Sequence, residues 1–67
     1  MVTVTANGKK FSVDESATIA QLLGELGWKP TQVVVEYNGR VLLRDEFHHT
    51  KLQEGDRLEI VVPVAGG

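Results

Sequence analysis

The sequence contains no cysteine, which excludes disulfide bonds, thiolate metal sites and a cysteine nucleophile. Basic residues are few: seven Lys and Arg stand against nine Asp and Glu, and the formal net charge is −2. Because these residues are scattered, we expect no basic surface for nucleic acid. The longest apolar run, residues 60–65, is far shorter than the about 20 residues that cross a membrane. The N-terminus lacks the basic and apolar segments of a secretory signal. These absences predict a cytoplasmic protein with neither a nucleic-acid nor a membrane partner.

A length of 67 residues predicts a single domain. A domain of this size buries roughly 60% of its unfolded surface, which makes it marginally stable on its own. A substrate pocket would compete with the core for the same few side chains. We therefore expect a protein that is not itself an enzyme.

The first 13 residues predict a β-hairpin. Apolar residues alternate with threonines over residues 2–6, which is the period of a half-buried strand. Asn7-Gly8 suits a type I′ turn, whose two central residues have positive φ. Residues 10–13 alternate again and are expected to form the returning strand.

The next segment predicts a helix. Thr18 and Gln21 stand three residues apart and fit a capping box. Gly27 suits the left-handed position after the last turn. Gly24 lies inside the helix, where glycine costs about 1 kcal/mol relative to alanine, and close approach to a sheet is one explanation. Apolar residues at helical spacing form one stripe, which consists of Ile19, Leu22, Leu23 and Leu26.

A second hairpin is predicted after the helix. Residues 32–37 are rich in β-branched side chains and favour a strand. Its alternation places Val33 and Val35 toward the core, and Val34 and Glu36 on the opposite face. Asn38-Gly39 is another type I′ turn signal, and it leads to a short strand at residues 40–43.

The last part of the domain predicts a strand at its centre. Residues 44–51 are polar and irregular, and Phe47 and Leu52 are expected to attach them to the core. Residues 57–62 alternate, and their inward side chains are predicted to be Leu58, Ile60 and Val62. This strand is hydrophobic enough to be central, and pairing with the first strand would be parallel.

The complete order is therefore β-β-α-β-β-β. It predicts the α+β class: one mixed sheet with a single helix packed on one face. We assign residues 1–62 to this domain and residues 63–67 to a C-terminal tail.

The sequence ends in Gly66-Gly67, directly after the apolar strand and three small or cyclic residues. A glycine backbone can enter places that no other residue can, because no β-carbon crowds it. The Gly67 carboxylate is therefore our candidate reactive group, although a terminal Gly-Gly alone also fits an ordinary frayed end.

The chain resembles the ubiquitin-like β-grasp sulfur carriers, and the resemblance covers nearly its whole length. The segments that carry it are residues 35–39, Arg44, residues 52–61 and Gly66-Gly67. The arrangement is most similar to the sulfur carriers of thiamin thiazole biosynthesis. The molybdopterin synthase small subunit shares the fold and the Gly-Gly end, and Pro63-Val64-Ala65 resembles that second family.

The resemblance implies a mechanism. An ATP-dependent adenylating enzyme, related to those that activate ubiquitin, would convert the Gly67 carboxylate to an acyl-adenylate. A persulfide donor protein would supply sulfur, and the resulting thiocarboxylate would deliver it to a thiazole synthase. The carrier would bind no cofactor and no metal, since ATP is used by its partner. Extended, residues 62–67 would span about 17 Å at roughly 3.4 Å per residue.

The predicted partner contacts lie near this end of the chain. Val34 and Val61 are expected on the sheet face away from the helix, where two exposed valines could form a docking patch. Arg57 and Arg44 could orient a partner from its rim. The tail residues Pro63, Val64 and Ala65 complete the predicted partner contacts, and Gly66 is assigned with Gly67 to the reactive end. Two other function classes stay open: a ubiquitin-like protein modifier, and a plain interaction module with an incidental tail.

Two further features are given structural interpretations. His48-His49 invites a metal site, but adjacent side chains diverge and no third ligand has suitable spacing. Trp28 follows the helix and is expected to cover the edge of the core.

Overall fold

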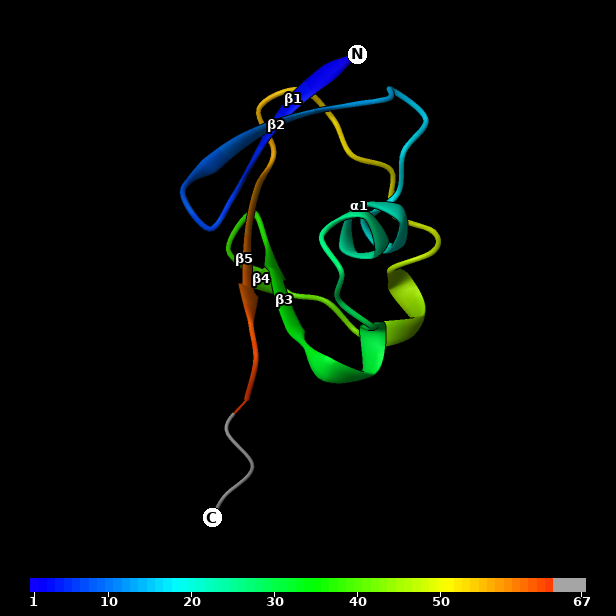
Figure 1. Ribbon diagram of the computed structural model, residues 1–67, viewed down its shortest axis with the longest axis vertical. Helices are drawn as coiled ribbons and strands as arrows, with labels where there is room; N and C mark the ends of the chain where they lie inside the picture. The colour runs from blue at the N-terminus through cyan, green and yellow to red at the C-terminus, as the bar shows by residue number, and fades with distance from the viewer. Residues whose placement is uncertain (64–67) are drawn as a thin grey trace.

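The computed structural model describes residues 1–63 of the chain. Five strands and one α-helix occur there in the order β-β-α-β-β-β (Figure 1). They are β1 (Val2–Ala6), β2 (Lys9–Val13), α1 (Ile19–Glu25), β3 (Val34–Tyr37), β4 (Arg40–Val41) and β5 (Arg57–Val61), with short 3₁₀ turns η1 (Pro30–Gln32) and η2 (Arg44–Glu46). The strands form one sheet in the order β2-β1-β5-β3-β4, and α1 lies to one side of it. The predicted α+β class is confirmed.

Strand β5 is the centre of the sheet. It runs parallel to β1, with Ala6 opposite Leu58, and antiparallel to β3, with Val34 opposite Val61. A parallel pair needs a crossover connection, and the segment containing α1 supplies one. The predicted central position and the parallel pairing are both confirmed.

The two hairpins turn at Asn-Gly pairs, as predicted. Asn7 and Gly8 have φ of 52° and 81°, and Asn38 and Gly39 have φ of 50° and 85°. Asparagine and glycine tolerate this left-handed region better than other residues, so local chemistry fixes where the strands reverse.

Helix α1 begins at the predicted capping box. The Thr18 hydroxyl accepts a hydrogen bond from the Gln21 N–H at 3.2 Å, and the Gln21 side-chain oxygen accepts one from the Thr18 N–H at 2.8 Å. Gly27 has φ of 85°, as expected for the residue after the helix. Our explanation of Gly24 is wrong, because a β-carbon added there would meet nothing within 4 Å.

The core fills the space between α1 and the sheet. Val33 and Val35 are buried while Val34 and Glu36 are exposed, and Phe47 and Leu52 are each 1% exposed; all six placements match the sequence. The buried set comprises Val4, Ala6, Val13, Ile19, Leu22, Leu23, Val33, Val35, Leu42, Phe47, Leu52, Leu58 and Ile60. Leu26, predicted on the helix stripe, is only partly buried.

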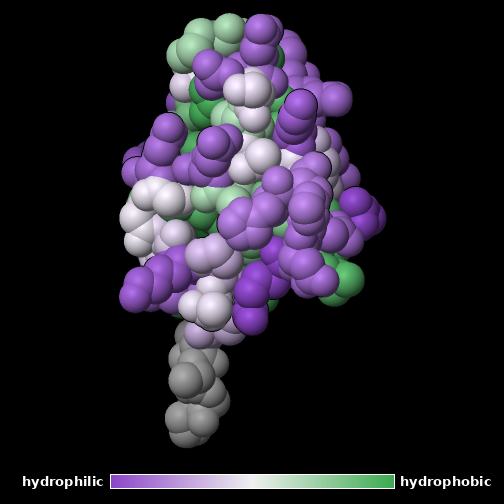
Figure 2. Space-filling view, turned by 90° about the vertical axis from the view of Figure 1, so that its right-hand side faces the viewer, coloured by the Kyte–Doolittle hydropathy of each residue, from purple (hydrophilic) through white to green (hydrophobic). Residues whose placement is uncertain are grey.

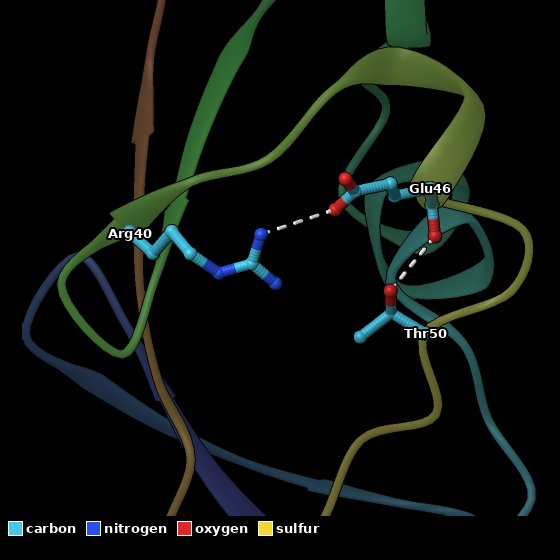
Figure 3. A network of polar contacts seen from close by, with 3 residues as sticks. All are labelled: Arg40, Glu46 and Thr50. Atoms are coloured by element: carbon cyan, nitrogen blue, oxygen red, sulfur yellow. Dashed lines mark hydrogen bonds and ion pairs between the residues drawn. The ribbon is translucent and has the colours of Figure 1, made fainter.

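The segment after β4 is held by polar contacts as well as by Phe47. The Arg40 guanidinium lies 3.6 Å from the Glu46 carboxylate, and the Thr50 hydroxyl donates to the Glu46 carbonyl at 2.8 Å (Figure 3). An exposed ion pair of this kind stabilises a fold by at most about 1 kcal/mol, so the buried side chains hold this segment in place.

Three predicted strand boundaries are wrong. Strand β3 begins at Val34 rather than residue 32, because η1 occupies residues 30–32. Strand β4 is only two residues long, because the chain soon enters η2, whose N-cap is Leu43. Strand β5 ends at Val61, opposite the first residue of β3. Val62 has no β3 partner in that register, and it is exposed rather than inward.

No helix in the part of the chain that the structure describes is long and apolar enough to cross a membrane.

Candidate docking site at the end of the central strand

The site is built around the point where β5 ends. Strand β5 runs beside the helix layer toward one end of the molecule, and the chain leaves the sheet there (Figure 1). Val61 is its last residue, and Val62 and Pro63 follow, both exposed. The candidate reactive residues Gly66 and Gly67, together with Val64 and Ala65, lie outside the described residues.

Two valines form an apolar pair beside this point. Val34 and Val61 are direct cross-strand partners, and such partners have β-carbons roughly 4.5–5.5 Å apart. Their side chains lie on the face opposite α1, with exposed fractions of 39% and 49%. The structure therefore brings these two predicted contact residues together, next to the exposed Val62.

Charged residues occupy the other end of the same face. Arg57 and Glu59 precede Val61 at alternate positions of β5, and Glu36 stands opposite Glu59. A shallow depression of about 450 Å³ is lined by Glu36, Asn38, Gly39, Arg57 and Glu59. Arg57 thus stands four positions before Val61 along β5, a distance of roughly 13 Å. It lies at the far end of this face rather than beside the pair.

The side of the molecule that carries α1 has a different surface. Figure 2 shows it to be mostly hydrophilic, with hydrophobic atoms in small separate areas. Trp28 is 37% exposed and lines a small cleft with Phe11, Leu26 and Ile60, which agrees with its predicted place at the edge of the core. His48 and His49 are both exposed, and no group of three potential metal-ligating side chains occurs within residues 1–63.

A buried carboxylate fixes the start of β5, and sequence reasoning missed it. Asp56 is 7% exposed. It accepts hydrogen bonds from the Tyr37 hydroxyl at 2.6 Å, the Gln53 N–H at 2.7 Å and the Asn38 side-chain amide at 3.1 Å. Burial, together with the Asp56 carboxylate, raises the pKa of Tyr37 to about 12. The turn-forming Glu54-Gly55-Asp56 was the only signal in the sequence, and it does not reveal these partners.

The family model of the ThiS family matches residues 2–67. The chain belongs to the ThiS family. This confirms the expected relationship to the ubiquitin-like β-grasp sulfur carriers. The matched range includes the tail residues that lie outside the described part of the structure.

Solved structures agree with this assignment. The crystal structure of a thiamine biosynthesis protein (ThiS) from Geobacter metallireducens has a TM-score of 0.82 and 38% identity, and the match covers 98% of this chain and 100% of that one. A ubiquitin-like protein from the archaeon Caldiarchaeum subterraneum has a TM-score of 0.51 and 16% identity over 97% of both chains. That second likeness shows the ubiquitin-like fold alone.

Curated relatives include longer proteins. The chain is 36% identical over 61 residues to a thiazole synthase of Paramagnetospirillum magneticum, which covers 91% of this chain but 19% of that protein. The ThiS-family chain thus spans about a fifth of the length of that relative. It is also 32% identical over 66 residues to the uncharacterized protein ycf40 of Pyropia yezoensis, covering 98% and 93% of the two chains.

Proposed function

We propose that this ThiS-family chain is a sulfur carrier whose Gly67 carboxylate is adenylated and converted to a thiocarboxylate that donates sulfur for thiamin thiazole formation. The observation that carries the proposal is the family match through Gly66-Gly67 on a domain whose central strand ends at Val61. Similarity to a solved thiamine biosynthesis protein favours this pathway over the molybdopterin pathway.

The chemistry needs an activated carboxyl group and a soft nucleophile. A carboxylate is a poor electrophile until one oxygen becomes part of a leaving group, so attack of Gly67 on the α-phosphate of ATP would release pyrophosphate and form the acyl-adenylate. Sulfide attack on that carbonyl would expel AMP and leave the thiocarboxylate. With a protein persulfide as donor, the product is an acyl disulfide, and a thiol must then cleave its S–S bond.

The carrier itself would contribute a folded domain that the partner binds and a C-terminal tail that carries the reactive group. Its described surface offers a valine pair beside the strand end, while glycine at the last two positions leaves no β-carbon to obstruct a narrow active site. An adenylating enzyme would use ATP and would contact Val34, Val61, Pro63 and the tail, with Arg57 meeting a more distant part of it.

A thiazole synthase is the proposed sulfur acceptor. Relatives named thiazole synthase contain a segment similar to this chain. The presence of both parts in one protein supports an association between this chain and a separate thiazole synthase. A persulfide-bearing protein is the proposed donor.

Intact-mass spectrometry tests the proposal. The chain ending in Gly67 is incubated with its adenylating enzyme, ATP and sulfide, and we expect a mass gain equal to replacement of one oxygen by sulfur, confined to the C-terminal peptide. Matched controls are the reaction without ATP and the chain lacking Gly67, neither of which should gain this mass. With an enzyme that is shown to be active on another carrier, absence of the product would refute the proposal, and isopeptide conjugates to lysines would indicate a protein modifier instead.

A further inference from the structure

The Asn7 side chain continues the sheet where the β1 backbone leaves it. The parallel ladder between β1 and β5 pairs Thr5 with Arg57 and Ala6 with Leu58, and the Asn7 N–H donates to the Leu58 carbonyl at 3.0 Å. At Asn7 the backbone turns away with φ of 52°. The next groups of β5 that face β1, those of Ile60, therefore have no further β1 backbone beside them.

The Asn7 carboxamide takes the place of that missing backbone. The Ile60 N–H donates to the Asn7 side-chain oxygen at 2.7 Å, and the Asn7 side-chain NH₂ donates to the Ile60 carbonyl at 3.1 Å. A carboxamide carries the same donor and acceptor as a peptide unit, so one side chain satisfies both polar groups of Ile60.

Asn38 performs the corresponding task at the opposite end and on the opposite edge of β5. Its backbone N–H donates to the Arg57 carbonyl at 2.8 Å, and its side-chain oxygen accepts from the Arg57 N–H at 2.8 Å. Both asparagines occupy the first position of an Asn-Gly turn. The two hairpins thus hold the two ends of the central strand, Asn38 where it begins and Asn7 where it ends.

We propose that Asn7 is a positioning residue that sets where the chain leaves the sheet, and that it thereby positions the C-terminal segment for the adenylating enzyme. This inference rests on the proposed function. With Asn7 in place, β5 is paired on both edges up to Ile60 and on its β3 edge at Val61. Without the carboxamide, the edge that faces β1 would lose its last two hydrogen bonds, and the partner would have to order that residue on binding.

Asn7→Gly is the test variant, since glycine keeps the positive φ of the turn and removes only the carboxamide. Asn38→Gly is the control, because it is the same substitution in the same kind of turn at the other end of β5, and it also removes the amide that donates to Asp56. In native-state hydrogen exchange, Asn7→Gly should speed exchange of the Ile60 amide by about tenfold or more relative to the amides of the core strands. Asn38→Gly should leave Ile60 protected and expose Arg57 instead.

Kinetics separate positioning from stability. With the adenylating enzyme, ATP and sulfide, at a temperature where both variants are fully folded, Asn7→Gly should raise the KM for the carrier by about tenfold, the cost of ordering one backbone residue, with kcat unchanged. Asn38→Gly should leave KM unchanged even if it lowers the melting temperature as much as Asn7→Gly does.

Unchanged Ile60 exchange in Asn7→Gly, or an equal rise of KM in both variants, would overturn the inference. Should Asn7→Gly fail to fold, Asn7→Asp keeps the acceptor for the Ile60 N–H and loses only the donor to the Ile60 carbonyl. The KM for the carrier should then rise by a smaller factor while Ile60 stays protected, and an unchanged KM would overturn the inference. Failure of the wild-type chain to form any thiocarboxylate would refute the proposed function and the kinetic role with it, while Ile60 exchange would still decide whether Asn7 holds the strand end.

Discussion

The valine pair beside the strand end gives the sharpest test of partner docking. The change is the double substitution Val34→Thr and Val61→Thr, which keeps the β-branched shape and the strand propensity but replaces an exposed methyl group with a hydroxyl on each residue. Both side chains are outside the core, so the urea unfolding midpoint should stay close to that of the wild type.

The expected effect follows from the exposed fractions. Complete burial of a valine side chain contributes about 1.5 kcal/mol, and Val34 and Val61 still expose 39% and 49% of their surface. A partner that covers both would therefore gain about 1.3 kcal/mol from them, which corresponds to nearly tenfold in affinity. We expect the KM for the carrier to rise by about that factor, measured as carrier-dependent pyrophosphate release by the adenylating enzyme.

Val41→Thr is the control for this experiment. Val41 is more exposed than either member of the pair, but it lies on the edge strand β4 opposite Glu36, away from the strand end. Its substitution should leave KM unchanged. If the double variant binds as well as the wild type, or if Val41→Thr weakens binding equally, the docking surface is not the valine pair.

Further predictions concern titration, packing and the tail. The pKa of Tyr37 is raised to about 12, first by burial and second by the hydrogen bond to Asp56. Its protonated form therefore contributes stability that is complete below pH 10 and is lost as the pH rises through about 12. Tyr37 is the only tyrosine in the sequence, so tyrosinate absorbance measures its titration, and a midpoint near 10 in the native protein would contradict this prediction. Leu22→Ala should lower the free energy of unfolding by about 2–5 kcal/mol through a core cavity, and an unchanged melting temperature would disprove the packing of α1. Gly24→Ala should raise the melting temperature by roughly 4–8 °C, because the site has room for a methyl group and alanine favours the helix by about 1 kcal/mol. A lower melting temperature in calorimetry would contradict the open space around Gly24. Gly66→Val should block thiocarboxylate formation in the mass assay while the urea curve stays unchanged, and loss of cooperative unfolding would show that the tail supports the fold.

Local chemistry explains why most of the fold could be predicted. The Asn-Gly pairs, the Thr18 capping box and the left-handed Gly27 each act within four residues, and each lies where the sequence placed it. Strand ends were less predictable because they depend on partners distant in the chain. Val62 continues the apolar alternation of β5, but β3 begins at Val34, opposite Val61, and this leaves Val62 exposed.

The candidate site was likewise predictable only where neighbouring residues decide its geometry. Alternation along two strands was enough to place Val34 and Val61 on one face, but not to show that Arg57 stands at its far end. Asp56 is an ordinary turn residue by sequence, and its burial depends on Tyr37 and Asn38, which lie 19 and 18 residues away. Hydrogen bonds over such separations leave no periodic signal, so only the structure reveals them.

Each of the two asparagines has a local role in its turn and a long-range role in holding β5. Glycine would satisfy the backbone of either turn, so the turn alone does not require a carboxamide. In the structure each asparagine also bonds to β5, over 53 residues for Asn7 and 19 for Asn38. A sequence rule follows. Where asparagine stands first in a tight hairpin turn, beside a strand that extends past that turn, its carboxamide can form the hydrogen bonds that a neighbouring backbone would otherwise form. For this chain the rule joins fold to function, because the residue that begins the first hairpin turn also holds Ile60, next to the end of β5 and to the segment that leads to the proposed reactive end.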